Sequence, residues 1–357
     1  MRHLFSGVLL LGLAACAAPA TQAPTITATE ASAEAERQSQ YVIERRRTEM
    51  ARLSNVANRI RVANEDLCPR KTMWIGATFE TIHDYAPDLR SAAVSVLALG
   101  DQPQVTYLVP AAPAEVGGLE VGDRVVAVDG KAIPKGAKAR RVLGEVLREA
   151  SADGALSLTV ERNAANVPVA ITPKSTCGYN FALVDGNEVN AYADGDDIFV
   201  YRGLLRFVET DDELAAVVGH EFAHNAMGHI QKSASNRRVG VAGGLLIDLA
   251  FAAGGVDTQG AFAKTGGQIG GQAFSQEFET EADYVGMYYL ARAGYDMSNV
   301  EGFWRRMAAE DPTAIKFGYS HPTTPVRSLN LSKAREEIEG KRSEGVAIAP
   351  TLKPAKE

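Results

Sequence analysis

Residues 210–224 of the chain read TDDELAAVVGHEFAH, and this stretch decides which fold the sequence predicts. It begins with a threonine followed three residues later by a glutamate, a capping box that indicates the start of a helix. In that helix His220 and His224 are four residues apart, so both imidazoles project from one face. Two imidazoles at this spacing can bind a single zinc ion, and Glu221 can reach a water bound to it. The stretch therefore predicts a helix that carries a catalytic metal site.

A third protein ligand is required, because a catalytic zinc keeps three protein groups and one open position. His229 lies nine residues after His220, which is about half a turn out of phase if the helix continues. A third histidine of the metzincin type would stand six residues after His224, where this sequence has Ile230. We therefore expect His229 to be a structural or surface residue.

The acidic residues of the segment 275–286 are the best source of the third ligand. Glu279 and Asp283 are four residues apart and share one helix face. Glu279 could bind the metal while Asp283 supports a ligand histidine from behind. The spacing by itself leaves Glu277 and Glu281 open, either as ligands or as solvated side chains.

The order HExxH followed by E-x-x-x-D resembles the gluzincin zinc metallopeptidases of the HtpX, BepA and LoiP type, metallopeptidase family forty-eight. Other stretches that resemble this family are 190–205, 294–296, 303–307 and 320–327. The resemblance implies one Zn²⁺ per chain, with Glu279 as the third ligand beside His220 and His224. HtpX-like members carry transmembrane helices that this sequence lacks, so the lipoprotein branch of the family is the closer likeness.

The resemblance also implies roles for residues outside the ligand set. His321 is expected near the zinc, where it stabilises the transition state or holds the enzyme latent; a loop histidine that fixes local structure is the alternative. Arg327 is expected to fix the helix that carries or contacts Glu279. The family's edge strand, which would align the substrate backbone by β-addition, resembles the residues Asn190, Ala191, Tyr192 and Ala193.

A β-rich block interrupts the peptidase-like sequence between residues 72 and 174. Its β-rich runs are 105–109, 125–128 and 156–160, and an amphipathic helix is predicted at 139–150. The run from Ala114 to Gly130, with its Gly-Leu-x-x-Gly-Asp turn, resembles a bacterial PDZ domain. The resemblance implies that Ile75, Gly76 and Ala77 hold the C-terminal carboxylate of a peptide that adds as a strand. A PDZ-shaped spacer without a ligand is the alternative.

Two cysteines flank this block. A helix is predicted over 41–66 and is ended by Cys68 and Pro69. Cys68 and Cys177 enclose a discrete block of sequence in a chain that carries an export signal, so we expect them to form a disulfide. Two buried free thiols are the alternative.

The N-terminus has the layout of a secretory signal, with a basic start, a short apolar stretch and small residues before the cleavage site. Residues 13–16 read LAAC and resemble the lipobox of bacterial lipoproteins. This resemblance implies that Cys16 is lipidated and holds the chain at the periplasmic face of the outer membrane; a plain signal peptide is the alternative. A net charge of −7 argues against a nucleic-acid partner, because no excess positive charge exists to neutralise phosphates.

The glycine-rich apolar stretch 239–255 lies between the two metal motifs. It is too short to span a membrane and contains Asp248. We expect a buried helix here, with a mobile lid over the cleft as the alternative.

Together these features predict an α+β chain with a mainly helical zincin (gluzincin) peptidase domain, a small edge sheet and a β-rich PDZ-like domain. The predicted divisions are the signal peptide 1–15, a flexible tether 16–40, the first peptidase helix 41–70, the PDZ-like domain 72–174, the peptidase domain 175–340 and a C-terminal tail 341–357. The predicted function is zinc-dependent hydrolysis of peptide bonds with Glu221 as general base. The family resemblance implies that the substrates are unfolded or misassembled cell-envelope proteins. The alternative is a periplasmic chaperone or assembly factor that binds extended chains beside a latent metal site.

Overall fold

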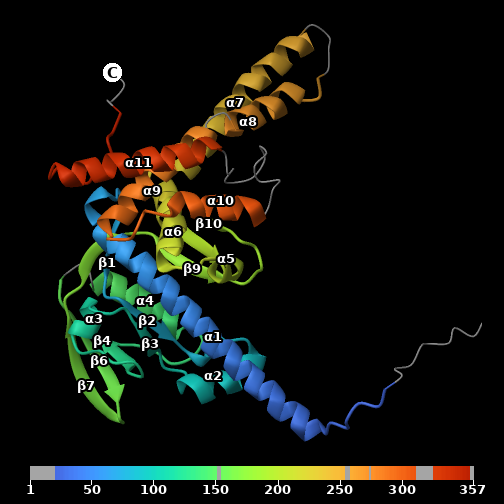
Figure 1. Cartoon of the computed structure of the whole chain (residues 1–357). Helices are drawn as coiled ribbons and strands as arrows, with labels where there is room; N and C mark the ends of the chain where they lie inside the picture. The colour runs from blue at the N-terminus through green and yellow to red at the C-terminus, as the bar shows by residue number, and fades with distance from the viewer. Residues whose placement is uncertain (1–20, 151–153, 254–257, 273–274, 311–324, 354–357) are drawn as a thin grey trace, which may run out of the picture.

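The computed structural model describes residues 21–150, 154–253, 258–272, 275–310 and 325–353. Figure 1 shows a helical region around α6 (Asp211–Ala226) and a β-rich region below it. A pair of helices, α7 (His229–Ala253) and α8 (Ala261–Gln272), projects away from both regions. The helical and β-rich regions have separate hydrophobic cores, so the α+β class predicted from the sequence is confirmed.

The long first helix, α1 (Ala28–Ala63), begins earlier than the sequence prediction placed it. Thr27 and Glu30 form a capping box. The Thr27 side chain accepts a hydrogen bond from the Glu30 amide, and the Glu30 carboxylate accepts one from the Thr27 amide at 2.8 Å. Residues 28–40 are rich in alanine and glutamate, which favour helix. This part of the tether predicted over 16–40 is therefore helical instead.

Helix α6, which carries the histidine motif, is buried along most of its length in the helical core. It contacts α1, α9 (Ser275–Arg292) and α10 (Val300–Glu310), while α11 (Pro325–Ser343) packs against α9. A three-stranded sheet borders α6 in the order β10–β11–β9, and the short helix α5 (Arg202–Phe207) follows β11 directly. The strands are β9 (Asn180–Val184), β10 (Ala191–Ala193) and β11 (Asp197–Tyr201). This is the small edge sheet that the sequence predicted.

The β-rich region is a sheet in the order β2–β3–β4–β6–β7, with β5 paired to β4. Its strands are β2 (Ala77–Glu80), β3 (Gln104–Leu108), β4 (Arg124–Val128), β5 (Lys131–Ala132), β6 (Leu156–Arg162) and β7 (Ala165–Ile171). Its helices are α2 (Arg90–Leu97), α3 (Pro113–Val116) and α4 (Ala139–Ala150), with short 3₁₀ turns at Ile82–Asp84 and Pro87–Leu89. Strands β3, β4 and β6 and helix α4 correspond to the predicted elements, whereas β7 and α2 were not predicted.

The β-rich region leaves and re-enters the helical region through one narrow neck. Strands β1 (Lys71–Trp74) and β8 (Lys174–Cys177) pair antiparallel there, after a 3₁₀ turn at Glu65–Leu67. Cys68 and Cys177 form a disulfide with a Cα–Cα distance of 5.5 Å. The Arg61 guanidinium donates to the Cys177 carbonyl at 2.9 and 3.1 Å, which ties α1 to the same neck.

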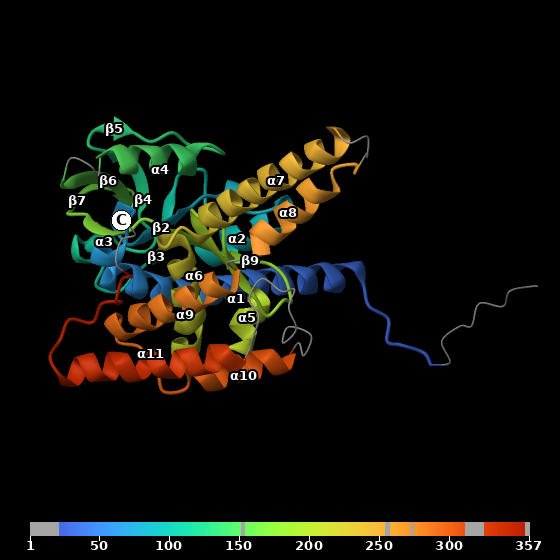
Figure 2. The ribbon, with the colours of Figure 1, turned by 90° about the horizontal axis from the view of Figure 1, so that it is seen from above.

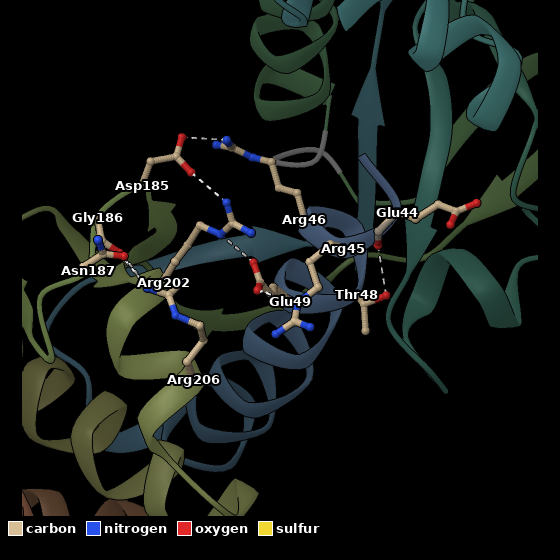
Figure 3. Close-up of polar contacts among 10 residues, drawn as sticks. All are labelled: Glu44, Arg45, Arg46, Thr48, Glu49, Asp185, Gly186, Asn187, Arg202 and Arg206. Atoms are coloured by element: carbon tan, nitrogen blue, oxygen red, sulfur yellow. Dashed lines mark hydrogen bonds and ion pairs between the residues drawn. The ribbon is translucent and has the colours of Figure 1, made fainter. Parts of the chain in front are cut away.

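A network of arginines and carboxylates fastens α1 to the first residue of α5 (Figure 3). The largely buried Glu49 carboxylate accepts from Arg45 at 2.9 Å and from Arg202 at 2.6 Å. Burial raises the pKa of Glu49, but the hydrogen bonds from Arg202 and Arg45 outweigh it, so this pKa lies below its ordinary value. Asp185 accepts from Arg46 and Arg202, at 2.8 and 3.4 Å, and so extends the network to the end of β9.

Helices α7 and α8 form an antiparallel hairpin whose far end extends beyond the body in both views (Figures 1 and 2). The helix predicted for residues 239–255 is present to Ala253, but the expectation that it is buried is wrong, because Leu246 is 70% exposed. Within the part of the chain that the structure describes, no helix combines the length and apolarity needed to cross a membrane.

Replacing Cys68 and Cys177 together by alanine should lower the free energy of unfolding by about 2–4 kcal/mol, because the bond closes a loop with a sequence separation of 109. Urea unfolding followed by circular dichroism measures the change. A reducing agent should destabilise the parent chain by a similar amount and leave the double variant unaffected. Equal free energies of unfolding for the parent chain and the double variant would show that this disulfide does not stabilise the fold.

Candidate metal centre

The capped helix α6 positions the first part of the site. Thr210 caps it by accepting from the Glu213 amide at 3.2 Å, while the Glu213 carboxylate accepts from the amide of Glu209 at 2.7 Å. His220 and His224 lie on the buried face of this helix, with their Nε2 atoms 3.0 Å apart. The four-residue spacing thus produces the adjacent imidazoles that the sequence predicted.

The carboxylate of Glu279, on α9, completes the cluster. One of its oxygens lies 3.3 Å from the His220 Nε2 atom and the other 3.3 Å from the His224 Nε2 atom. The carboxylate reaches them because α6 and α9 cross closely. A Cβ atom at Gly286 would lie 3.1 Å from the His220 amide nitrogen, and one at Gly219 would lie 2.6 Å from a Leu290 methyl carbon. Glycine at both positions lets the two backbones come this near.

These three side chains fit a metal ion. All three are buried, and their nearest ligand atoms lie within 4.8 Å of one another. Ligand atoms about 2.0–2.1 Å from a tetrahedral zinc stand about 3.3 Å apart, and the observed separations are 3.0, 3.3 and 3.3 Å. Two neutral imidazoles and one carboxylate leave one tetrahedral position open, which is the donor set of a catalytic zinc site.

Asp283 and Arg327 orient His220 from behind. The Nδ1 atom of His220 lies 2.9 Å from an Asp283 carboxylate oxygen, which itself accepts from Arg327 at 2.7 and 3.1 Å. The Arg327 guanidinium stacks over Trp304, 3.5 Å from the ring centroid. Burial and the Arg327 charge lower the pKa of His220, but the hydrogen bonds to Asp283 and Glu279 outweigh both effects, so the pKa is raised to about 9. Without a metal this imidazole is therefore protonated at pH 7, and a bound metal would displace the proton on Nε2. The Nδ1–H held by Asp283 then leaves the Nε2 lone pair directed at the cluster.

His224 is also held through its Nδ1 atom, by a pair of residues that the sequence analysis did not find. Its Nδ1 atom lies 3.1 Å from Nδ1 of His229, and Nε2 of His229 lies 2.8 Å from the Glu281 carboxylate. Burial lowers the pKa of His229 to about 4, so this imidazole is neutral at pH 7. It can therefore donate to Glu281 and accept from His224 at the same time, which directs the Nε2 lone pair of His224 at the cluster.

The half-turn argument about His229 is wrong because the helix does not continue. Helix α6 ends at Ala226, Gly228 adopts φ +66°, and α7 begins at His229. Of the two expected roles, the structural one is confirmed and the surface one is wrong: His229 is not one of the three clustered ligands, and it is buried against His224 and stacks on Phe278. The signal that was available is Gly228, since a glycine in the left-handed conformation commonly ends a helix.

The other expected site residues lie on two further elements. The segment Asn190–Ala193 contains β10, the edge strand of its sheet, where Tyr192 is 37% exposed and stacks on Phe199. Asn225 ties this sheet to α6, because its side chain accepts from the Gly195 amide at 2.8 Å and donates to the Asp197 carbonyl at 3.1 Å.

The expected carboxylate loop of the β-rich region lies between β1 and β2. Within it, Gly76 adopts φ +81° and its carbonyl accepts from Val109. Of the alternatives for the third ligand, Glu277 is exposed and Glu281 binds His229 instead. Cys16 and His321 lie outside the described residues.

Two protein families match the chain. The family described as "Peptidase family M48" matches residues 151–335, and the family described as "PDZ domain" matches residues 104–162. The peptidase match overlaps β6 and β7, which the structure places in the sheet of the β-rich region, so the structural division lies at β8.

Three relatives show how far the likeness extends. A beta-barrel assembly-enhancing protease of Yersinia pestis is 30% identical over 44% of this chain and 34% of its own length. The mitochondrial metalloendopeptidase OMA1 of Schizosaccharomyces pombe is 29% identical over 49% of this chain and 52% of its own. The metalloprotease LoiP of Escherichia coli is 28% identical over 43% of this chain and 61% of its own. The chain thus spans between a third and two thirds of these relatives.

Replacing His229 by leucine should weaken zinc binding by about 10–100-fold, because the buried Nδ1–H of His224 loses its acceptor. Glu281→Gln should cost less, since glutamine can still accept from His229. Competition with a chromogenic chelator measures the affinity, and circular dichroism confirms that each variant folds.

The matched control is His83→Leu, because His83 lies in the β-rich region and pairs with Asp101. It should bind zinc as tightly as the parent chain. An unchanged zinc affinity of the His229 variant would remove this residue from the support of His224.

Proposed function

This chain belongs to peptidase family M48 and carries a PDZ domain, and we propose that it is a zinc-dependent endopeptidase with one metal ion per chain. The observation that carries the proposal is the buried cluster of His220, His224 and Glu279, whose separations suit tetrahedral coordination. Each imidazole is held by its own carboxylate, directly by Asp283 or through His229 by Glu281. Such outer contacts fix the ligand tautomers before a metal arrives.

The proposed mechanism assigns proton transfer to Glu221. When bound, a zinc ion supplies a Lewis acid that polarises the scissile carbonyl and lowers the pKa of a water at its open position. Glu221 follows His220 on α6 and is 2% exposed, and its negative charge raises the pKa of His224, which supports its place beside the metal ligands. Glu221 takes the proton of the attacking water and then delivers it to the leaving amine.

Two elements would present the substrate. Strand β10 is at the edge of its sheet, and an extended chain can add to an edge by backbone hydrogen bonds. Asn225 holds this sheet directly beside the end of the helix that carries His224, so an added strand would run past the metal cluster. The loop Ile75–Ala77 of the PDZ domain would hold the C-terminal carboxylate of a peptide on its backbone amides.

The cell envelope is the proposed place of action. Several relatives are named beta-barrel assembly-enhancing proteases, which supports unfolded or misassembled envelope proteins as substrates. Lipidation of Cys16 would hold the chain at the periplasmic face of the outer membrane. The proposed domain boundaries are residues 72–174 for the PDZ-like domain and residues 175–340 for the peptidase domain.

The second candidate function is a chaperone or assembly factor with a latent metal site. The exposed edge strand and the PDZ domain support it, because elements of both kinds can bind extended chains without cleaving them. A zinc-loaded chain that suppresses aggregation of an unfolded protein but never cleaves it would favour this function. The His321→Ala variant addresses latency, since loss of a blocking histidine would then release cleavage of casein.

Glu221→Gln should keep about one zinc per chain and lose roughly 10²–10⁴-fold in the rate of casein cleavage, because the amide cannot accept the water proton. Metal content and cleavage are measured on the same preparation, with and without chelator. The control is Glu336→Gln, an exposed position on α11, which should cleave at the parent rate. Unchanged turnover of the Glu221 variant would end this mechanism.

The PDZ loop gives a separate prediction. Gly76→Ala should weaken binding of a peptide with a free C-terminus by about tenfold or more, since a charge-assisted hydrogen bond is lost when the loop shifts. A Cβ atom at Gly76 would lie 2.2 Å from the Cβ of Ala112, in a backbone conformation with φ +81°. Fluorescence anisotropy of a labelled peptide measures the affinity.

Gly118→Ala is the control for backbone strain, because Gly118 has φ +85° with open space around it. It should bind the peptide like the parent chain. Equal affinity of the parent for the free acid and for the C-terminal amide would show that this loop does not hold a carboxylate.

A further inference from the structure

The α7–α8 hairpin exposes large apolar side chains and buries small or polar residues, which reverses the usual pattern of a helix in water. The exposed fractions on α7 are 49% for Leu245, 70% for Leu246, 46% for Ile247, 57% for Leu249 and 44% for Phe251. Three of these residues are consecutive, so at about 100° per residue the exposed apolar surface covers more than half of the helix circumference.

The contact between the two helices explains why these side chains point outward. Gly244 and Asp248 are the buried positions of this part of α7. A Cβ atom at Gly244 would lie 2.0 Å from the carbonyl oxygen of Phe262, so the two backbones touch. Helices that pack in hydrocarbon also meet through small residues and turn their large apolar side chains outward.

Asp248 is the only charged side chain between Val239 and Ala253, and it is hidden inside the hairpin. Its carboxylate accepts from the amides of Phe262 at 3.2 Å and Ala263 at 2.8 Å, and from the hydroxyl of Thr258. It thereby satisfies amides in the first turn of α8. The hairpin therefore presents no acidic side chain among the described residues of its apolar end.

The charge of the hairpin is opposite to that of the whole chain. Residues 229–272 carry four lysines or arginines and two aspartates, whereas the formal net charge of the chain is −7. Arg237, Arg238 and Lys264 are exposed, and none of them pairs with an acidic side chain that the structure describes. Since α8 runs back along α7 from the contact of Phe262 with Gly244, all three cations lie on the body side of the apolar end.

The length of the apolar end matches one leaflet of a bilayer. From Leu245 to Ala253 the helix rises about 13 Å, and half of a hydrocarbon core is about 15 Å. Cations at the near end of this segment would then stand at the level of the phosphates, where each contributes to binding an anionic surface.

We propose that the α7–α8 hairpin inserts its apolar end into one leaflet of a membrane that contains anionic lipids, with Arg237, Arg238 and Lys264 at the headgroups. The insertion is independent of any lipid on Cys16 and of the peptidase activity. Because α7 begins at His229 and α8 leads into α9, which carries Glu279, both arms of the hairpin join the metal centre directly. The insertion therefore holds this centre about 24 Å from the edge of the hydrocarbon at Leu245, from the rise per residue between His229 and Leu245.

Site-specific quenching in the full chain tests the insertion without interference from the N-terminus. Leu246→Trp and Leu249→Trp are mixed with phosphatidylglycerol–phosphatidylcholine vesicles that carry bromine midway along the acyl chains. Relative to the parent chain, emission of the tryptophan at position 249 should fall roughly twofold compared with unbrominated vesicles, and emission at position 246 should fall less, because the two positions lie about 6 Å and about 2 Å beyond Leu245 along the helix. The control Val116→Trp, at a position 78% exposed in the PDZ domain, should not be quenched.

The charged residues are tested in the Leu249→Trp chain. Adding Arg237→Gln and Arg238→Gln should weaken binding to anionic vesicles by about tenfold, since each cation near the surface contributes to affinity. The parent should bind pure phosphatidylcholine vesicles more weakly than anionic ones. Equal binding to both lipids by the parent and the double glutamine variant would overturn the headgroup role.

Two results would overturn the insertion itself. One is the absence of bromine quenching at both Leu246→Trp and Leu249→Trp. The other is an emission shift that depends on protein concentration and not on vesicles, accompanied by a larger mass in light scattering, which would show that the hairpin binds a second copy of the chain.

Discussion

The close crossing of α6 and α9 is the constraint on which the rest of the peptidase region depends. Gly219 and Gly286 let the two backbones approach until a Cβ atom would clash, and this brings the Glu279 carboxylate to two imidazoles on the other helix. Larger residues at the crossing would push α9 outward and separate the ligand atoms. The remaining core, with Phe222 and Tyr288 among its buried side chains, holds the two helices at that distance.

The two histidines of the cluster are held by different means, and this difference affects their proton affinity. His220 contacts a buried carboxylate directly, which raises its pKa to about 9. His224 contacts a neutral imidazole, and burial lowers its pKa. In both cases the Nδ1 side is occupied, so that the Nε2 atoms point to one position, as a metal ligand set requires.

Two insertions are attached to this framework. The PDZ domain precedes the histidine motif in the sequence, and the α7–α8 hairpin lies between that motif and Glu279. The PDZ domain leaves and returns through the paired strands β1 and β8, where the disulfide and Arg61 limit its movement relative to α1. The α7–α8 hairpin is instead joined to the two helices that carry the metal ligands. A peptide bound by one insertion and a surface bound by the other would both be positioned relative to the same metal cluster.

The sequence alone determined the features that depend on spacing within one element. The four-residue interval of His220 and His224 predicted the histidine pair, and the short β-rich runs that form β3, β4 and β6 predicted the β-rich block. The paired cysteines form the bond that was expected. Only the tertiary structure decided which residues meet once a helix has ended and the chain has changed direction. His229 reaches His224 because Gly228 redirects the backbone, and the apolar residues of α7 face outward because its small residues contact α8. Local periodicity specifies which residues share a face, but it contains no information about what that face will contact.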